Sequence, residues 1–198
     1  MVSFGICLIT TLLCAQSDVK PMQAKQSTED TKAKSDAELD KKAIEWTTSL
    51  ALNDKVKERR VNAAIATHLK LVRDWHNEHP PTIVPAGINP ATGNKLSDLD
   101  RQVIASSAMP KSVHDDLMNV LKAELTPLKT EAVLDKYTIG KVDFTLKGYH
   151  AIVTDLTAEE ETKILGFLKQ AREQAIDYKN MKEISAIFEI YKTKSNNT

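Results

Sequence analysis

The sequence predicts one all-α domain of about six or seven helices, with a long Pro/Gly loop and at most one short extended strip. Apolar residues recur at spacings of three and four over most of the chain, the period of a helix with one buried face. Ser, Thr or Asp precedes several of these runs, where helix N-caps are expected. Four of the seven prolines and two of the six glycines fall within residues 80–94, which predicts a loop there.

Residues 1–17 are predicted to be a signal peptide. Positions 2–14 are apolar and uncharged, and this run is too short to span a membrane as a helix. Cleavage after Ser17 and cleavage after Ala15 both leave small residues at the expected places. Attachment of a lipid at Cys14 is an alternative. The prediction is therefore an exported protein, either periplasmic or at the cell surface or secreted.

The cysteine content and the charge balance of the sequence exclude several classes of function. Both cysteines, Cys7 and Cys14, lie in the leader, so the mature domain would have no thiol for a disulfide, a nucleophile or a metal. Residues 18–36 are polar and lack an apolar period, which predicts a disordered tether before a helical domain at 37–194. The 27 Lys and Arg residues balance 27 Asp and Glu residues and are interspersed with them, so no basic face for nucleic acid or a membrane surface is expected.

The helical domain is predicted to open with two helices. The second would run from about 55 to 77, with Asp54 as its N-cap. Its apolar positions form two neighbouring lines, so we expect a central helix with contacts on two sides. The first helix, with Ser35 or Asp36 as its cap, carries an apolar line of Leu39, Ala43, Trp46 and Leu50.

The second helix is predicted to end at His79, because two prolines follow. Residues 80–94, PPTIVPAGINPATGN, should form an irregular loop with stretches of polyproline II geometry. A loop of this length is either a functional segment or a tolerated insertion, and both interpretations stay open.

Three shorter helices are expected after this loop. Ser97, with Asp100 three residues later, is the predicted cap of the first. Pro110 suits the first position of the second helix, and Thr126 followed by Pro127 is a cap-then-proline start for the third.

The next segment, TIGKVDFT at 138–145, is rich in β-branched and aromatic residues and is predicted to be extended. A short helix over 147–153 would then place Tyr149 and His150 beside this strip.

Residues 156–194 have the clearest helical period in the chain. Thr157 and Glu160 form a predicted capping box, in which each side chain accepts the backbone N–H at the other's position. The polar tract at 177–180 should divide the run into two helices that pack as an antiparallel pair.

The sequence has no catalytic signature, and we predict no catalytic residue, no metal ligand and no cofactor. His76 and His79 have a spacing that could share a metal ion, but no third ligand is recognisable, and the alternative is that they close the helix. Pairs of acidic residues stand in first turns or on polar faces, where helix capping and solvation explain them. A glycosidase would instead need two carboxylates facing each other across a cleft.

Aromatic side chains are what a sugar-binding surface uses, because their faces stack on the apolar side of a pyranose ring. Most aromatic residues of this chain fall on predicted core lines. Trp75 and Tyr149 border irregular segments, and each has a histidine beside it. Together with His76, they are the predicted ligand-binding residues.

Three segments of the mature chain resemble a secreted bacterial family known as domain of unknown function 3826. They read LNDKVKERRVNAAIATHLKLVRDWHNEH, ELTPLKTEAVLDKYTIGKVDFTLKGYHAIVTDLTAEEETKILGFLKQAREQAID and KEISAIFEIYKTKSNN. The most specific parts are KGY followed by an LT-x-E-E helix start, and the AREQAID element. The resemblance implies export and a helical fold over nearly the whole mature chain. It also directs the functional expectation toward carbohydrate, because sugar binding has been suggested for the family.

Two functions of different classes are expected. The first is non-enzymatic binding of an oligo- or polysaccharide near Trp75, the 80–94 loop and Tyr149. The second is a periplasmic chaperone of the LTxxQ type, since Leu-Thr helix starts occur twice, although Lys129 and Glu160 stand where that motif has Gln. A concave pocket with aromatic and polar groups would favour the first, and a bare apolar concave face the second. An enzyme is a third alternative.

Overall fold

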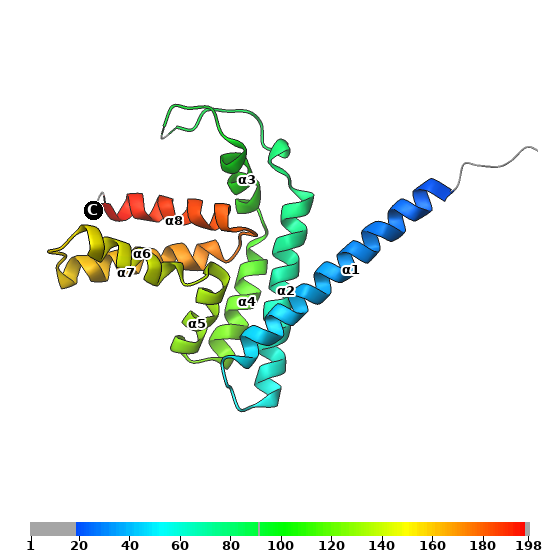
Figure 1. Ribbon diagram of the computed structural model, residues 1–198, viewed down its shortest axis with the longest axis horizontal. Helices are drawn as coiled ribbons and strands as arrows, with labels where there is room; N and C mark the ends of the chain where they lie inside the picture. The colour runs from blue at the N-terminus through cyan, green and yellow to red at the C-terminus, as the bar shows by residue number, and fades with distance from the viewer. Residues whose placement is uncertain (1–18, 91, 197–198) are drawn as a thin grey trace, which may run out of the picture. The chain divides into compact units, whose positions relative to one another are not determined.

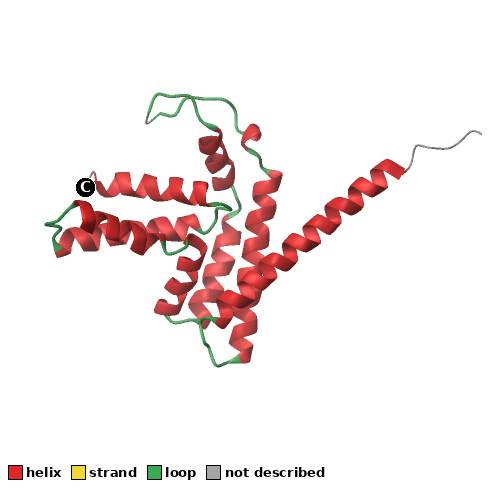
Figure 2. Ribbon diagram, viewed as in Figure 1, coloured by secondary structure: helices red, strands yellow, loops and turns green. Residues whose placement is uncertain are grey.

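The computed structural model describes residues 19–90 and 92–196, so the predicted signal peptide at 1–17 lies outside the described residues. The described chain contains eight α-helices and a short 3-10 turn, with no strand in this part of the chain (Figures 1 and 2). The all-α prediction is therefore confirmed, with more helices than the six or seven expected. In chain order the elements are α1 Val19–Thr48, α2 Lys55–Glu78, η1 Pro81–Ile83, α3 Asp98–Ser107, α4 Lys111–Glu124, α5 Pro127–Thr138, α6 Lys141–Ile152, α7 Ala158–Ala175 and α8 Met181–Asn196.

The segment predicted as a disordered tether, 18–36, is helical from Val19 onward, as the first part of α1. Its Ala, Lys, Glu and Gln residues have high intrinsic helix propensity, and Lys32 lies 3.9 Å from Asp36 one turn later. Its polar composition indicates that the segment has no apolar face to bury, but a helix can form without such a face. The chain divides into two compact units between Glu38 and Leu39, and the rest of the description concerns the second unit.

The first core cluster is formed by the end of α1 together with α2, α4 and α5. Three of the four residues of the apolar line predicted on the first helix, Ala43, Trp46 and Leu50, are buried, whereas Leu39 is only partly buried. The ring of Trp46 meets that of Tyr137 edge-on, with centroids 4.8 Å apart. This burial fixes how the four helices pack. The cluster comprises Ala43, Trp46, Leu50, Val61, Ile65, Ala66, Leu117, Met118, Leu121, Leu125, Val133, Leu134, Tyr137 and Ile176.

The second core cluster is formed by α6, α7 and α8. The tract at 177–180 separates α7 from α8 as predicted, and the two helices lie side by side (Figure 1). The apolar lines predicted on both helices supply most of the cluster. Its members are Val142, Ile164, Leu168, Ala171, Ala175, Tyr178, Ile184, Ile187 and Phe188.

The prediction of an extended strip at 138–145 is wrong. α5 ends at Thr138. The next two residues, Ile139 and Gly140, adopt left-handed backbone conformations with φ of 54° and 63°, and α6 begins at Lys141. Val142 is buried in the second cluster, so packing at a helical period overrides the weak local preference for an extended chain. Ile139 is 72% exposed, which shows that its side chain contributes little to this corner.

Local capping signals were predicted correctly at four helix starts. Asp54 accepts the backbone N–H groups of Val56 and Lys57 at 2.9 and 3.1 Å. Thr126 caps α5 just before a proline, and capping boxes begin α3 and α7. Pro110 differs slightly, because it is the N-cap of α4 and not its first helical residue.

The loop at 80–94 contains no α-helix, as predicted, but it is not featureless. It includes the turn η1 and an isolated antiparallel bridge between Ile88 and Lys95. Two side chains of α3 hold its beginning: Arg101 Nε donates to Val84 O at 2.9 Å, and Gln102 Nε2 donates to His79 O at 3.0 Å. The loop is therefore attached to α3 (Figure 1).

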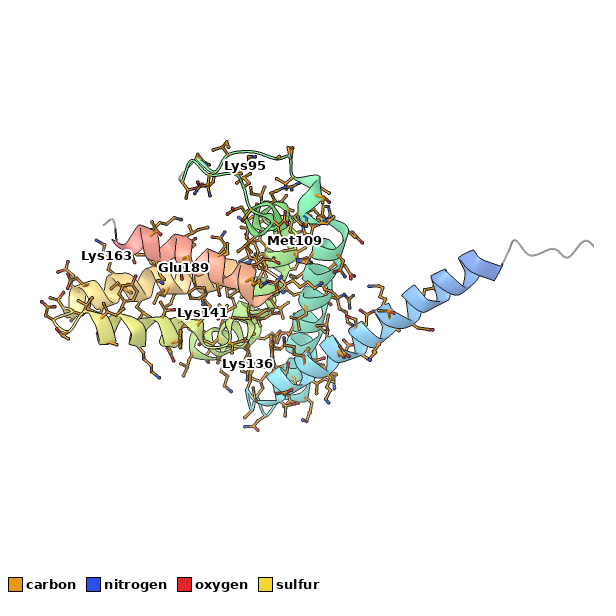
Figure 3. The ribbon with its side chains drawn as sticks, turned by 45° about the horizontal axis from the view of Figure 1, so that its top comes forward. Lys95, Met109, Lys136, Lys141, Lys163 and Glu189 are labelled. Carbon is orange, nitrogen blue, oxygen red and sulfur yellow. The ribbon has the colours of Figure 1, made fainter. Side chains whose placement is uncertain are left out.

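Charged side chains gather on the outward faces of the helices and loops. Lys95, Lys163 and Glu189 in Figure 3 are examples, and all three are exposed. None of the described helices is long and apolar enough to cross a membrane.

Candidate functional site

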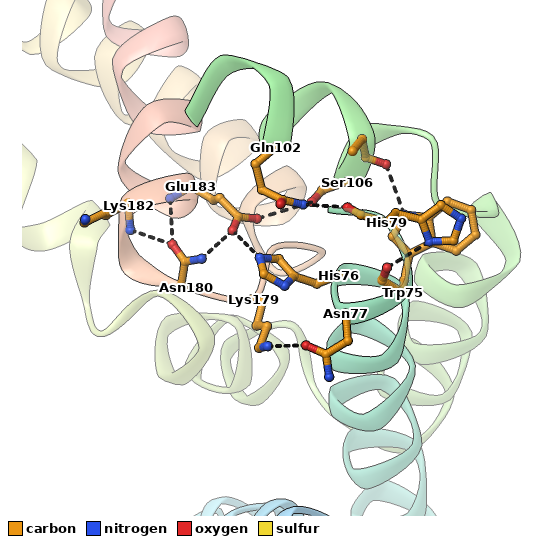
Figure 4. A network of polar contacts seen from close by, with 11 residues as sticks. Trp75, His76, Asn77, His79, Gln102, Ser106, Lys179, Asn180, Lys182 and Glu183 are labelled. Carbon is orange, nitrogen blue, oxygen red and sulfur yellow. Dashed lines mark hydrogen bonds and ion pairs between the residues drawn. The ribbon is translucent and has the colours of Figure 1, made fainter. Parts of the chain in front are cut away.

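Trp75 and His76, two of the three predicted ligand-binding residues, lie in the last turns of α2. The indole Nε1 of Trp75 donates to Ala105 O at 3.0 Å, and its ring stacks on His79 with centroids 3.6 Å apart and planes 12° from parallel. His76 Nε2 lies 2.9 Å from Glu183 Oε1 (Figure 4). Both side chains thus join α2 to neighbouring elements.

Tyr149, the third predicted residue, lies on α6 and packs against the second core cluster. Its hydroxyl is 3.2 Å from Ser195 Oγ on α8. The structure therefore places Tyr149 among elements other than those around Trp75 and His76. A ligand-binding role for these three residues stays a prediction.

Glu183 of α8 is the centre of a buried polar network (Figure 4). Its side chain is only 1% exposed, and it accepts hydrogen bonds from His76 Nε2, from the amide of Asn180 and, at 3.3 Å, from Ser106 Oγ. Gln102 Nε2 extends the network by donating to the same Ser106 Oγ at 3.3 Å. A buried carboxylate needs such partners, because its charge loses the solvation of water. The network joins α2, α3 and α8.

The alternative that His76 and His79 share a metal ion gains no support from the geometry. His79 Nδ1 donates to Trp75 O at 2.8 Å, whereas His76 Nε2 is directed to Glu183. Within residues 19–90 and 92–196, no group of three or more His, Cys, Asp or Glu side chains is arranged to hold a metal ion.

A cavity of 610 Å³, here called the His114 cavity, opens between α4, α7 and α8. One side is the link from α3 into α4, where Met109 is labelled in Figure 3. The opposite side is the last part of α7. The lining residues are Ser106, Ser107, Met109, Pro110, Lys111, His114, Gln170, Glu173, Gln174, Asp177, Tyr178 and Tyr191.

Asp177 lies where α7 gives way to the link before α8, and two imidazoles donate to it. His114 Nδ1 donates to Oδ2 at 2.9 Å, and His68 Nε2 donates to Oδ1 at 3.1 Å. Burial acts to raise the pKa of the Asp177 carboxyl, but the hydrogen bonds from His114 and His68 outweigh it and leave that pKa lowered. Asp177 is therefore an ionised acceptor with both oxygens engaged.

The hydrogen bond between His114 and Asp177 also changes the pKa of His114. Its hydrogen bond to Asp177 raises the imidazole pKa, burial opposes this, and the nearby charges of Asp177, Glu173 and Asp115 add to the rise. Because Asp177 holds Nδ1, the other ring nitrogen, Nε2, is turned toward Glu173 Oε1 at 3.8 Å. Asp177 thus fixes the orientation of a histidine that lines the cavity and favours its protonated form.

Behind Asp177, His68 connects the cavity wall to the first core cluster. His68 is 2% exposed, and its ring meets that of Tyr137 edge-on with centroids 5.3 Å apart. Burial, with a smaller contribution from Asp177, raises the pKa of the Tyr137 hydroxyl well above its ordinary value. The inner side of the site is therefore closed by packed rings.

The cavity combines a polar wall with aromatic side chains. Gln170, Glu173, Gln174 and Asp177 follow one another at spacings of three, one and three along α7 and its end, so they share one helical face. Two amides and an exposed carboxylate on this face can donate to and accept from a ligand. The half-buried Tyr191 adds aromatic surface, whereas Tyr178 is 6% exposed and belongs to the second core cluster. Lys194 Nζ lies 4.2 Å from the centroid of the Tyr191 ring.

Sequence reasoning did not single out His114, and it interpreted Asp177 and Tyr178 only as a helix break. His114 and Asp177 are 63 positions apart, and no local pattern connects residues at that separation. For Glu183 a local signal existed, since it stands four residues before the buried Ile187 and so shares its helical face.

The fold and cavity define a class: an all-helical protein with a polar and aromatic pocket near part-buried acid–histidine pairs. The chain belongs to the protein family of unknown function DUF3826, whose sequence profile matches residues 18–198. The expected family membership is thereby confirmed over residues 18–198. No curated protein matches the chain.

Proposed function

We propose that this protein is exported and binds carbohydrate without converting it, and that the His114 cavity receives the sugar. The observation that carries the proposal is the polar face of α7 opposite the start of α4, with the half-buried Tyr191 lining the same space. Hydroxyl-rich ligands are recognised by side chains that both donate and accept, with aromatic rings against the apolar sugar face. At 610 Å³ the cavity lies within the range of ligand pockets, about 300–1,000 Å³.

This location differs from the groove near Trp75 and Tyr149 that the sequence predicted. The hydrogen bond of Trp75 to Ala105 and its stacking on His79 support a structural role for that indole. Tyr149 likewise packs against the second core cluster. The His114 cavity is therefore the better supported location for a sugar.

A groove between α2 and α4 favours the second candidate, a chaperone for unfolded clients. It encloses 350 Å³, and its lining includes Leu71, which is 43% exposed, with Val113 and Val120 of α4. Much of its α2 side consists of Ala63, Ala64 and Thr67, however, which offer little apolar area to a client. Carbohydrate binding is therefore the first proposal.

Titration calorimetry of the mature protein against a panel of oligosaccharides tests the proposal. We expect saturable binding that Tyr191→Ala and Gln174→Ala weaken by about tenfold or more, the loss of roughly 1.4 kcal/mol of contact energy. Lys163→Ala, on the exposed face of the same α7, is the matched control and should bind as the wild type does.

The variants Trp75→Phe and Tyr149→Phe separate the two locations. Loss of binding in these variants, with no effect in the cavity variants, would move the site back to the residues that the sequence predicted. Absence of any binding across the panel, together with suppression of client aggregation by the same protein, would replace the proposal by the chaperone.

A further inference from the structure

The ionisable groups of the His114 cavity limit the charge of its ligand. Four charged side chains line it: Lys111 and His114, which can be positive, and Glu173 and Asp177, which can be negative. With His114 protonated the lining charges sum to zero, and with His114 neutral they sum to one negative charge. In neither state does the lining have a net positive charge.

One of the two positive groups, His114, is already balanced by carboxylates. Asp177 holds His114 through a hydrogen bond of 2.9 Å, and Glu173 lies 3.8 Å from the other ring nitrogen. Among the described lining residues Lys111, exposed at the start of α4, is the remaining cation, Lys194 lies over the ring of Tyr191, and Glu173 is exposed across the cavity. The first N–H groups of α4 have no side-chain cap, but their partial positive charge is about half a unit, less than one carboxylate.

From this balance we infer that the cavity takes a neutral oligosaccharide and rejects uronate-containing or sulfated glycans; the inference rests on the proposed function. An acidic sugar would lie beside the exposed carboxylate of Glu173, and a lining without net positive charge does not offset that repulsion. A neutral sugar meets no such repulsion, and adjacent hydroxyls of its ring can donate to Glu173 and accept from the amides of Gln170 and Gln174.

Paired titrations test the charge preference. The full mature protein is titrated with neutral gluco-, galacto-, manno- and xylo-oligosaccharides and with galacturonate and sulfated oligosaccharides of matched length, at low and high salt. We expect neutral ligands to bind at least about tenfold more tightly, with an affinity that does not change with salt.

Glu173→Gln is the diagnostic variant, because it keeps the shape of the side chain and leaves the cavity with one net positive charge when His114 is protonated. It should raise the affinity for acidic oligosaccharides by about tenfold at low salt, an increase that high salt removes. Glu189→Gln removes the same charge from an exposed position of α8 outside the cavity, and it should change neither affinity.

The outcomes are distinct. Tighter binding of acidic sugars to the wild-type protein, or no gain for acidic sugars in Glu173→Gln, would overturn the charge inference while carbohydrate binding stands. No binding of any sugar would overturn the proposed function itself, and the inference with it.

Discussion

Replacing Glu183 by alanine removes the acceptor at the centre of the α2–α3–α8 network. Its 1% exposed carboxylate accepts from His76, Asn180 and Ser106, so the truncation leaves the buried Ser106 hydroxyl and the half-buried His76 imidazole without this acceptor and also opens a cavity. Leaving a buried hydrogen-bonding group without its partner costs about 1–3 kcal/mol. That is a large share of a total stability of roughly 5–15 kcal/mol.

Urea unfolding of the mature protein, followed by far-UV circular dichroism, measures the loss as a lower midpoint at an unchanged slope. Glu189→Ala is the matched control on the same helix, because Glu189 is exposed and pairs with the neighbouring Lys192 at 3.0 Å. We expect it to stay within about 0.5 kcal/mol of the wild type. A difference of less than about 1 kcal/mol between Glu183→Ala and this control would refute the reasoning that the network stabilises the fold.

Two further predictions follow from backbone conformation and from titration. Ile139→Gly should stabilise the domain by roughly 1 kcal/mol, since glycine adopts the left-handed conformation at φ 54° without strain and the lost side chain is 72% exposed. The control is Ile139→Ala, which keeps the Cβ atom and should show no such gain in the same urea experiment. The raised pKa of His114 contributes stability that is fully present below the ordinary imidazole pKa of about 6.5 and is lost as the pH rises through the pKa of His114 in the folded protein. The lowered pKa of Asp177 contributes stability that is present above the ordinary carboxyl pKa of about 3.9 and is lost as the pH falls through the pKa of Asp177 in the folded protein. Melting temperatures across the pH range should therefore show these contributions at their largest between about pH 4 and 6.5, and Asp177→Asn should flatten the profile; an unchanged profile in that variant would contradict the assignment.

The parts of the fold that depend on near neighbours were accessible from the sequence. Asp54 and Thr157 begin helices where a capping side chain and an apolar period coincide within four residues, and the link at 177–180 shows as a gap in that period. The 80–94 loop was likewise indicated by its prolines, which remove backbone donors wherever they stand.

The parts that depend on distant neighbours were not accessible. The segment at 138–145 has β-forming residues, but burial of Val142 against α7 and α8 decides its conformation. The His114 cavity lies between α4 and α7, and the charge state of its histidine depends on Asp177, 63 positions away in the sequence. A single sequence contains no signal for such a pairing.

The acid–histidine contacts beside the His114 cavity also determine at which stage of folding the cavity can form. His68 and Asp177 are 109 positions apart in the chain, and His76 and Glu183 are 107 apart. Contacts that close such long loops are costly in chain entropy and are made late in folding. Most of the first core cluster needs only residues before 138, so it can assemble before the α7–α8 pair docks. A chain stalled before that docking would be largely helical and collapsed, yet it would have no His114 cavity, and ligand binding would therefore report completed folding.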